Sequence, residues 1–494
     1  MAPWCRFDMW RYPQSDKVSF FDDLRAQMQQ RPALNASKWR RTPQACTVCR
    51  SPETAAQSGK PKPPARHTYR EDVRRWPTRY SQTGANVLHN PDQMVLNDTW
   101  SDLRQFRDMP EVDFDRLFAY REGRLREQMR AHGVGLLMLV NPISLRYAAE
   151  YRTYGLFQSH IPTTYLLMPA DGPASLFSAY SQTSSVRDFR PGRPIHHFDG
   201  GDGLADFAAL LAQDIRDFLS EHGDTTNRVG LEYVNPSLTQ ALERLGIEVV
   251  DGVPLSEAAR VIKSADEVAC IRWACAVAQL GISKLEEALR PGVSETQLWA
   301  LLNYTNLAND GDWHDGRMLA SGERINPWLQ EANQRVIEDG DLVGFDTDMV
   351  GPLGYFADIS RTLHCGPSRP TRVQKALYRE AVAEVEHNMS LIRPGVTLNQ
   401  FRERAKPMDE RFHAQAYTCM LHAVGMCDEY PQIKHPWQEQ PYDCEFQAGM
   451  VLCVESYCGE VGARDGVKLE QQVLVTDTGI ELLSDYPWDE RLMD

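Results

Sequence analysis

The stretch Leu342-Val-Gly-Phe-Asp-Thr-Asp348 leads from an apolar strand directly into two acidic residues. The turn Gly351-Pro-Leu-Gly354 follows, and the chain returns through residues 355–363, so the segment predicts a β-hairpin. Side chains alternate along a strand, which predicts that Asp346 and Asp348 share one face. The turn is centred midway between Asp346 and Asp358, so these two acids are expected to lie close together across the hairpin.

A second hairpin of the same character lies near the end of the chain. Met450-Val-Leu-Cys-Val454 leads into Glu455, and a turn over residues 462–466 leads back to Lys468-Leu-Glu470, which brings Glu455 and Glu470 together. Acids on a single hairpin could simply face solvent. Carboxylates that converge from two hairpins repel one another unless cations neutralise them, so the pair of hairpins predicts a metal site.

The helices that precede the two hairpins repeat one pattern. Arg290-Pro-Gly-Val-Ser294-x-x-Gln297 returns as Arg393-Pro-Gly-Val-Thr397-x-x-Gln400. In both copies a Pro-Gly pair ends one helix and a Ser/Thr-x-x-Gln capping box opens the next. Helix ends can resemble one another by coincidence, but an acidic hairpin after each copy favours two duplicated halves related by a pseudo-two-fold axis.

One imidazole suits this acidic set. His422 lies in the run Thr418-Cys-Met-Leu-His-Ala-Val-Gly425, which is followed by Asp428 and Glu429. A lone histidine in an apolar run is most often a core residue, but the His-x-x-Gly step and the following acids favour a ligand. An oxygen-rich set with a single imidazole suits iron, manganese or zinc.

The 494 residues suffice for two or three units at about 150 residues per domain. Residues 1–105 are rich in Pro, Arg, Gln and Ser and are expected to form a loosely ordered extension or arm. Residues 106–262 alternate between helices and strands, which predicts a sheet covered by helices. Ser264-x-x-Glu267 is a capping box that opens a helix to about Leu289, so the catalytic domain is expected over residues 263–494.

Composition excludes several classes of function. A formal charge of −15 argues against nucleic-acid and membrane partners. No run approaches the roughly 18 apolar residues of a membrane span, and residues 1–25 lack the apolar core of a secretory signal. Eleven scattered cysteines indicate reduced thiols and a cytoplasmic protein. Cys46-x-x-Cys49 is better interpreted as incidental thiols than as a metal or redox site, because no second pair follows at zinc spacing.

These residues resemble a known superfamily. The metal site of the pita-bread enzymes, which include methionine aminopeptidases, prolidases and creatinase, looks like a set of five segments in this chain. They are Asp346, Asp358, His422-Ala-Val-Gly425, residues 449–455 and Lys468-Leu-Glu470. The resemblance covers about residues 106–494. It implies an α/β (α+β) fold with a creatinase/prolidase-like N-terminal domain followed by a pseudo-two-fold pita-bread catalytic domain.

Two departures from the peptidase pattern point to a narrower family. Residues 319–328 lack the histidine that pita-bread peptidases carry there, and Asp428 stands where a second histidine should follow the His-x-x-Gly step. Asp348 is an additional acid. Several positions of this chain are similar to the pita-bread dimethylsulfoniopropionate (DMSP) lyases. They are Asp346-Thr-Asp348, Asp358-Ile-Ser-Arg-Thr362, Tyr417, Asp428 and Ser484-Asp-Tyr-Pro-Trp488.

This second resemblance implies an activity and a set of roles. The reaction would be elimination of dimethyl sulfide from DMSP, a small zwitterionic sulfonium compound, with acrylate as the other product. Two metal ions, iron before manganese or zinc, would be held by Asp346, Asp348, Asp358, His422, Glu455 and Glu470. Asp428 would act as the base, with Glu429 as an alternative. Tyr417 and Phe157 would line the substrate pocket, Phe157 standing where the lyases are expected to have a tryptophan.

Two other functions stay open from the sequence. An Xaa-Pro-type metallopeptidase shares the superfamily pattern but would need substitutes for both missing histidines. A metal-free binding protein of the same fold would not need to keep all six ligand positions. The resemblance also implies a homodimer.

Overall fold

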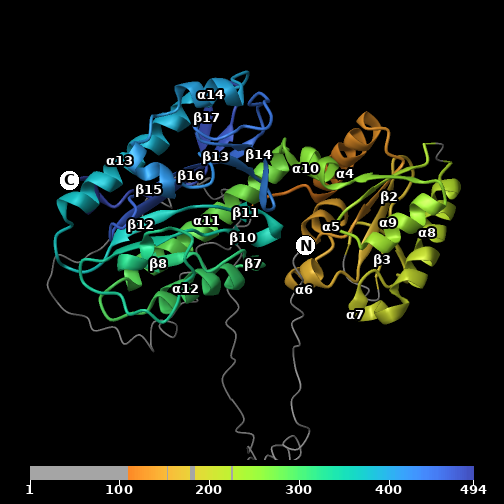
Figure 1. Cartoon of the computed structure of the whole chain (residues 1–494), viewed down its shortest axis with the longest axis horizontal. Helices are drawn as coiled ribbons and strands as arrows, with labels where there is room; N and C mark the ends of the chain where they lie inside the picture. The colour runs from red at the N-terminus through yellow and green to blue at the C-terminus, as the bar shows by residue number, and fades with distance from the viewer. Residues whose placement is uncertain (1–109, 153, 179–183, 224–225) are drawn as a thin grey trace, which may run out of the picture. The chain divides into compact units, whose positions relative to one another are not determined.

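The computed structural model describes residues 110–494 except residues 153, 179–183 and 224–225. The expected arm over residues 1–105 and the Cys46-x-x-Cys49 pair lie outside the described residues. The described chain contains an N-terminal sheet domain and a larger domain that carries both acidic hairpins (Figure 1).

The N-terminal domain is built on a six-stranded mixed sheet in the order β4-β3-β2-β1-β5-β6. Its central strand β1 pairs antiparallel with β2 and parallel with β5. The strands are β1 (Leu136–Leu139), β2 (Tyr165–Pro169), β3 (Ser175–Phe177), β4 (Asp188–Arg190), β5 (Arg228–Leu231) and β6 (Glu248–Asp251). The helices are α4 (Phe114–Ala131), α5 (Pro142–Ala149), α6 (Gly155–His160), α7 (His197–Gly200), α8 (Leu204–Glu221), α9 (Pro236–Arg244) and α10 (Val253–Arg260), with a 3₁₀ turn η4 (Gly201–Gly203).

Both faces of this sheet are covered. Leu136 and Met138 of β1 belong to one apolar core with residues of α8 and α9. Leu137 and Leu139, which point to the opposite face, belong to another core with residues of α4 and α5. The fully buried β1 therefore reads as a continuous apolar run, as expected for a strand covered on both sides. The alternation of helices and strands that the sequence predicts for residues 106–262 is present in the described part of that range.

The first half of the larger domain runs from α11 (Ala265–Ala288) to β12 (Arg361–His364). Between them lie α12 (Glu295–Ala308), β7 (Trp313–His314), β8 (Leu319–Ser321), η5 (Gly322–Ile325), β9 (Leu342–Phe345), β10 (Met349–Val350), η6 (Pro352–Gly354) and β11 (Phe356–Ala357). The hairpin is divided between two three-stranded sheets, ordered β12-β9-β8 and β11-β10-β7.

The second half forms one five-stranded sheet in the order β14-β13-β15-β16-β17. Two helices and a 3₁₀ helix precede it, and the last helix follows it. The elements are α13 (Arg372–Leu391), α14 (Leu398–Arg404), η7 (Glu410–Gln415), β13 (Leu421–Val424), β14 (Asp428–Ile433), β15 (Val451–Gly459), β16 (Gly466–Val475), β17 (Ile480–Leu482) and α15 (Glu490–Met493).

The repeated sequence pattern corresponds to repeated local structure. Ser294 caps α12 and Thr397 caps α14, each through a complete capping box, which confirms that prediction. Gly292 and Gly395 adopt positive φ angles of 96° and 82°, a conformation that glycine tolerates without a Cβ clash. Each capping residue also forms an isolated β-bridge with the segment that enters the following sheet, to Val336 in the first half and to Glu445 in the second.

One described helix, α11, is long and apolar enough to cross a membrane by length and composition. However, 83% of its most apolar window is buried inside the protein, and it opens with the predicted capping box at Ser264. It therefore packs as a core helix of this fold.

Candidate metal centre

Two segments of the first half, the one between β9 and β10 and the one after β11, and three strands of the second half supply the predicted ligands. Asp346 directly follows β9, and Asp358 directly follows β11. His422, Glu455 and Glu470 lie within the adjacent strands β13, β15 and β16. Glu455 and Glu470 are register partners across β15 and β16, which confirms the predicted pairing of the second hairpin.

The first hairpin differs from its prediction in detail. Phe345 pairs with Arg361, and Met349 pairs with Ala357, so the turn is centred on Leu353, one residue later than expected. This register sets Asp348, and not Asp346, opposite Asp358. Regular strand pairing also stops between Phe345 and Met349, and Asp348 adopts a positive φ of 33°. This backbone turn, and not simple strand alternation, lets Asp346 and Asp348 contribute to one cluster.

His422 lies among three of the carboxylates. Its Nε2 is 2.9 Å from Glu455 Oε1, 3.5 Å from Asp358 Oδ2 and 3.8 Å from Glu470 Oε1. Its Nδ1 is 3.1 Å from the carbonyl oxygen of Ala423. Such a carbonyl contact orients an imidazole and favours a proton on Nδ1, which leaves Nε2 available as a ligand atom.

The donor geometry fits a metal centre. Ligand atoms of Asp346, Asp348 and Asp358 lie within 4.8 Å of one another, and those of Asp346, Glu455 and Glu470 do the same. Oδ1 of Asp346, Oδ1 of Asp358 and Oε1 of Glu470 are buried without any hydrogen-bond partner among the described residues. Because a buried polar atom without a partner is costly, these oxygens are suited to coordinate hard cations.

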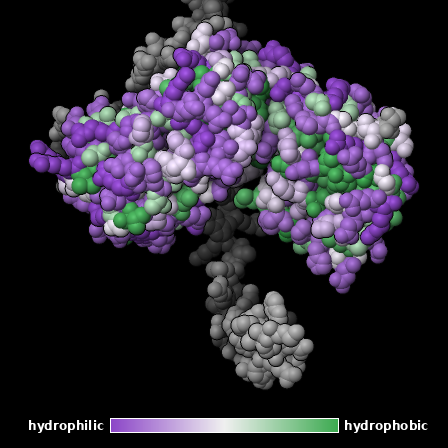
Figure 2. Space-filling view, turned by 45° about the horizontal axis from the view of Figure 1, so that its top comes forward, coloured by the Kyte–Doolittle hydropathy of each residue, from purple (hydrophilic) through white to green (hydrophobic). Residues whose placement is uncertain are grey.

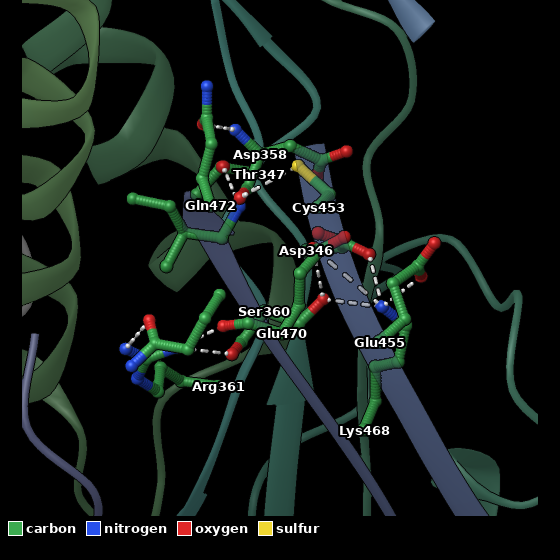
Figure 3. Close-up of polar contacts among 12 residues, drawn as sticks. Asp346, Thr347, Asp358, Ser360, Arg361, Cys453, Glu455, Lys468, Glu470 and Gln472 are labelled. Carbon is green, nitrogen blue, oxygen red and sulfur yellow. Dashed lines mark hydrogen bonds and ion pairs between the residues drawn. The ribbon is translucent and has the colours of Figure 1, made fainter. Parts of the chain in front are cut away.

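A lysine lies inside the acid cluster. Nζ of Lys468 is 2.8 Å from Glu455 Oε2, 3.2 Å from Asp346 Oδ2 and 3.8 Å from Glu470 Oε2. It also donates to Oγ of Ser360 at 2.8 Å, and its side chain is completely buried (Figure 3). Lys468 therefore supplies one fixed positive charge to a cluster of five carboxylates.

Burial and neighbouring charges reinforce each other at some members of the cluster and oppose each other at others. Burial raises the pKa of Asp358 and of Glu470 well above the usual range, and the negative charge of the neighbouring carboxylates adds to this effect. Burial acts in the same direction at Asp346 and Glu455, but Lys468 reverses it and lowers the pKa of both. Burial disfavours a charged His422, yet Glu455 raises the pKa of its imidazole well above the usual value.

A layer of hydrogen bonds holds the two hairpins against each other. The backbone N–H of Asp358 donates to Oε1 of Gln472 at 3.0 Å, and Oγ of Ser360 donates to Oε2 of Glu470 at 3.0 Å. The fully buried Arg361 donates to the carbonyl oxygen of Glu470, so it ties β12 to β16 (Figure 3). It also donates to the carbonyl oxygen of Tyr486, which ties β12 to the C-terminal segment. Partners of this kind fix the orientation of ligand side chains.

Asp428 and Glu429 begin strand β14 and have opposite surroundings. The side chain of Asp428 is 67% exposed, and its Oδ1 lies 3.6 Å from Nδ1 of His422. The side chain of Glu429 is completely buried and paired with Arg260 at 2.8 Å and Lys263 at 2.9 Å. Because alternation sends successive side chains to opposite faces, Glu429 serves the contact with the N-terminal domain. These contacts give no support to Glu429 as the base, and Asp428 stays the predicted one.

The two predicted pocket aromatics also separate. The ring of Tyr417 lies under Nζ of Lys468 at 4.5 Å, at the edge of the acid cluster. The ring of Phe157 lies in α6 and contacts His160 and Phe198 of its own domain. Among the described contacts, none joins Phe157 to the acid cluster.

Two features of the site were not recognised from the sequence. The first is the role of Lys468 in the cluster. Period-two alternation sets Lys468 on the same face of its strand as Glu470, and this signal in the Lys468-Leu-Glu470 run could have placed it in the cluster. Asp315 is another acid near the site, since its backbone N–H donates to the carbonyl oxygen of Asp348 at 3.0 Å. No motif of the sequence marks Asp315, because an irregular loop brings it there.

Known proteins resemble this chain along most of its length. Residues 121–262 match the family described as Creatinase/Prolidase N-terminal domain, and residues 269–477 match Metallopeptidase family M24. A relative from Roseovarius nubinhibens, dimethylsulfoniopropionate lyase DddP, is 35% identical over 77% of this chain and 88% of its own length. The protein of the same name from Roseobacter denitrificans is 33% identical over 78% of this chain and 89% of its own length.

Solved structures agree on the fold. An Xaa-Pro dipeptidase from Bacillus anthracis superposes with a TM-score of 0.60 at 21% identity, covering 75% of this chain and 98% of the dipeptidase. These matches confirm the expected creatinase/prolidase-like domain followed by a pita-bread domain, and at this identity they concern the fold alone.

Proposed function

The chain belongs to the DddP family of dimethylsulfoniopropionate lyases, within the creatinase/prolidase and M24 superfamily, and from this we propose that it is a metal-dependent DMSP lyase. The reaction cleaves DMSP to dimethyl sulfide and acrylate by β-elimination. The enzyme is thus a carbon–sulfur lyase and not a hydrolase.

Six residues hold the metal ions in this proposal: Asp346, Asp348, Asp358, His422, Glu455 and Glu470. We propose two ions, held by carboxylate oxygens and one imidazole, a donor set that suits iron, manganese or zinc; iron is favoured because of the resemblance to the DMSP lyases. Metal held there supplies Lewis-acid polarisation of the substrate carboxylate, which makes the adjacent α-proton more acidic. The unpartnered oxygens of Asp346, Asp358 and Glu470 support this assignment.

The base in this proposal is Asp428. Its carboxylate accepts the α-proton of DMSP, the electron pair of the C–H bond forms the new C=C bond, and the Cβ–S bond breaks to release neutral dimethyl sulfide. Partial desolvation by the surrounding protein raises the pKa of Asp428. The positive charge of His422 opposes this effect, and the negative charges of Glu455, Asp315 and Asp346 add to it. A carboxylate with a raised pKa is a stronger base near neutral pH.

The observation that carries the assignment is the position of Asp428 relative to the buried acids. Asp346, Asp358, Glu455 and Glu470 are nearly inaccessible, whereas Asp428 is exposed and lies next to His422. It can therefore reach a substrate whose carboxylate enters the cluster. A neutral leaving group that departs from a sulfonium needs no acid, so one base is sufficient.

The test measures two activities of the metal-loaded protein. We expect dimethyl sulfide and acrylate from DMSP, and little cleavage of a proline dipeptide. Asp428→Asn should lower kcat by about 10²–10⁴-fold while the metal content is unchanged, the range for loss of a general base. The exposed Asp477 in the β16–β17 turn provides the control, since Asp477→Asn makes the same charge change and should retain the wild-type rate. Dipeptide cleavage without dimethyl sulfide would instead establish the metallopeptidase.

Three further assignments complete the proposal. Tyr417 and Phe157 are proposed to provide aromatic faces for the sulfonium group, an interaction of about 0.5–2 kcal/mol for a cation over a ring. Tyr417 has the stronger support because its ring already lies beside the cation of Lys468. We further propose a cytoplasmic homodimer, with size-exclusion chromatography combined with light scattering as the test of its oligomeric state.

A further inference from the structure

A large cavity opens beside the proposed base. Its volume is about 800 Å³, and most of its wall belongs to the N-terminal domain. Trp313, Asp315 and Cys427 form the part of the wall that comes from the catalytic domain. Cys427 directly precedes Asp428 in the sequence, so this part of the cavity adjoins the reaction site. Figure 2 shows apolar surface gathered on the N-terminal domain and a more hydrophilic surface on the catalytic domain.

Trp313 and Asp315 are held as a pair. Nε1–H of Trp313 donates to Oδ1 of Asp315 at 2.9 Å. Strand β7, which contains Trp313, pairs with β10 directly after Asp348. On the other side, the indole packs against Gly155 of α6, where a methyl group would come within 2.4 Å of Trp313 Cζ3. The position of the indole is therefore fixed from both domains.

The charge of Asp315 is not neutralised by the protein. No Lys, Arg or His side chain in the described part of the chain forms an ion pair with it, and its side chain is exposed. Among the described residues no arginine lines this cavity, and Arg152, which lines a neighbouring pocket with Trp313, is already paired with Asp312 at 2.7 Å and with Asp310 at 2.8 Å. Asp315 lies close to Asp348 and Asp428, so this end of the cavity is negative.

We propose that Trp313 and Asp315 form the subsite that recognises the cationic end of the substrate. The inference rests on the proposed function, since it assumes that the substrate carboxylate enters the acid cluster beside Asp428. An indole face and an unpaired carboxylate are the two groups that best attract a sulfonium or quaternary ammonium. The subsite selects positive charge on a small aliphatic acid, and it supplements Tyr417 and Phe157 as sources of that selectivity.

The test uses two probes that differ only in charge. One is the zwitterionic trimethylammonium analogue of DMSP, and the other is its isostere with a neutral tert-butyl end, in which a carbon atom replaces the nitrogen and the carboxylate is kept. Neither probe needs to be cleaved, so calorimetric Kd values on the metal-loaded protein separate this inference from the lyase assignment. We expect wild-type protein to prefer the ammonium probe by about tenfold, because the indole face and the carboxylate both attract its positive end.

Variants then assign that preference to the subsite. Asp315→Asn should lower the preference for the ammonium probe by about tenfold, mainly by weakening the binding of that probe. Trp313→Leu should lower the preference as well, and Asp315→Glu should keep most of it. Asp477→Asn is the charge-matched control. Unchanged melting temperature and metal content establish that the variants are folded.

Two results would overturn the proposal. One is wild-type protein that binds both probes equally well, and the other is an Asp315→Asn variant that keeps the full cation preference. If the charge preference behaves as expected but DMSP gives no dimethyl sulfide, the lyase assignment fails while the cation subsite stands.

Discussion

The two acidic hairpins occupy equivalent places in the two halves of the catalytic domain, yet they are built differently. In the second half, β15 and β16 pair without interruption from Val451–Leu474 to Gly459–Gly466. In the first half, the hairpin divides into β9 with β12 and β10 with β11, and Asp348 lies at the break with a positive φ. The second hairpin also contributes a buried lysine two residues before Glu470, while the residue two before Asp358 in the first is the apolar Phe356.

This difference assigns distinct tasks to the two halves. A regular ladder fixes Glu455 and Glu470 opposite each other and holds their charges against Lys468. The broken ladder frees backbone groups around Asp348, one of which accepts a hydrogen bond from Asp315. We therefore expect the regular hairpin to hold two of the proposed ligands rigidly, and the irregular one to bring Asp348 and Asp315 close to the remaining proposed ligands. Backbone conformations of this kind are concentrated at functional sites.

The largest expected effect comes from removing the charge that distinguishes the regular hairpin. Lys468→Met leaves Asp346 and Glu455 buried without their cation. Breaking a buried ion pair on one side costs about 3–5 kcal/mol, so the metal-free variant should unfold at a markedly lower denaturant concentration. Added metal should recover part of that stability by mass action. Equal stability of metal-free wild-type and variant protein would contradict the role given to Lys468.

A comparison of one acid from each hairpin measures their unequal importance for metal binding. Glu470→Gln keeps the shape of a fully buried side chain but removes its charge, and it should weaken metal binding by more than about 100-fold, beyond the range for residues that only support a ligand. Asp348→Asn should have a smaller effect of about 10–100-fold. Metal titration followed by elemental analysis measures both, and an equal loss in the two variants would remove the distinction between the hairpins.

The same contrast explains what could be predicted from the sequence. Period-two alternation and a short turn determine the second hairpin, so the contact of Glu455 with Glu470 follows from residue spacing alone. The break at Asp348 depends on a backbone conformation that many residues adopt rarely, and no pattern of hydrophobic residues encodes it. Asp315 was missed for a related reason, because it lies in a loop whose path is set by the pairing of β7 with β10.

Neighbouring residues give a second example. Asp428 and Glu429 look interchangeable in the sequence, and only the partners on each face of β14 separate them. Arg260 and Lys263, which neutralise Glu429, come from the junction between the two domains. Their approach depends on tertiary packing, which the local sequence around β14 does not contain.

The pH dependence of stability should differ between metal-free and metal-loaded protein. In the folded protein without metal, the pKa values of Asp358, Glu470 and His422 are raised. At a pH above the ordinary pKa values of these groups, the folded state therefore binds more protons than the unfolded state. Its stability must then fall as pH rises from about 4.5 toward the raised values, by about 1.4 kcal/mol per pH unit for each extra proton.

Metal holds these groups deprotonated in the folded state and should abolish this decline. The stabilisation that metal provides is therefore expected to grow with pH between about 5 and 8. Chemical denaturation of chelated and metal-loaded samples across this range measures the difference. A metal-induced stabilisation that stays constant with pH would show that the cluster does not bind the extra protons.

The smallest expected effect tests the two halves where they are most alike. Ser294→Ala and Thr397→Ala each remove one capping box, at an expected cost of about 1 kcal/mol. Ser294 is buried, so the N–H group of Gln297 has less access to water once the cap is lost, and its variant should be the less stable of the two. Thr478→Ala, on the exposed turn before β17, should stay within about 0.5 kcal/mol of wild type. If Thr397→Ala lowers the free energy of unfolding more than Ser294→Ala does, the second half depends on its helix cap more than the uninterrupted pairing of β15 and β16 suggests. The contrast between a regular and an irregular half would then apply to the hairpins alone.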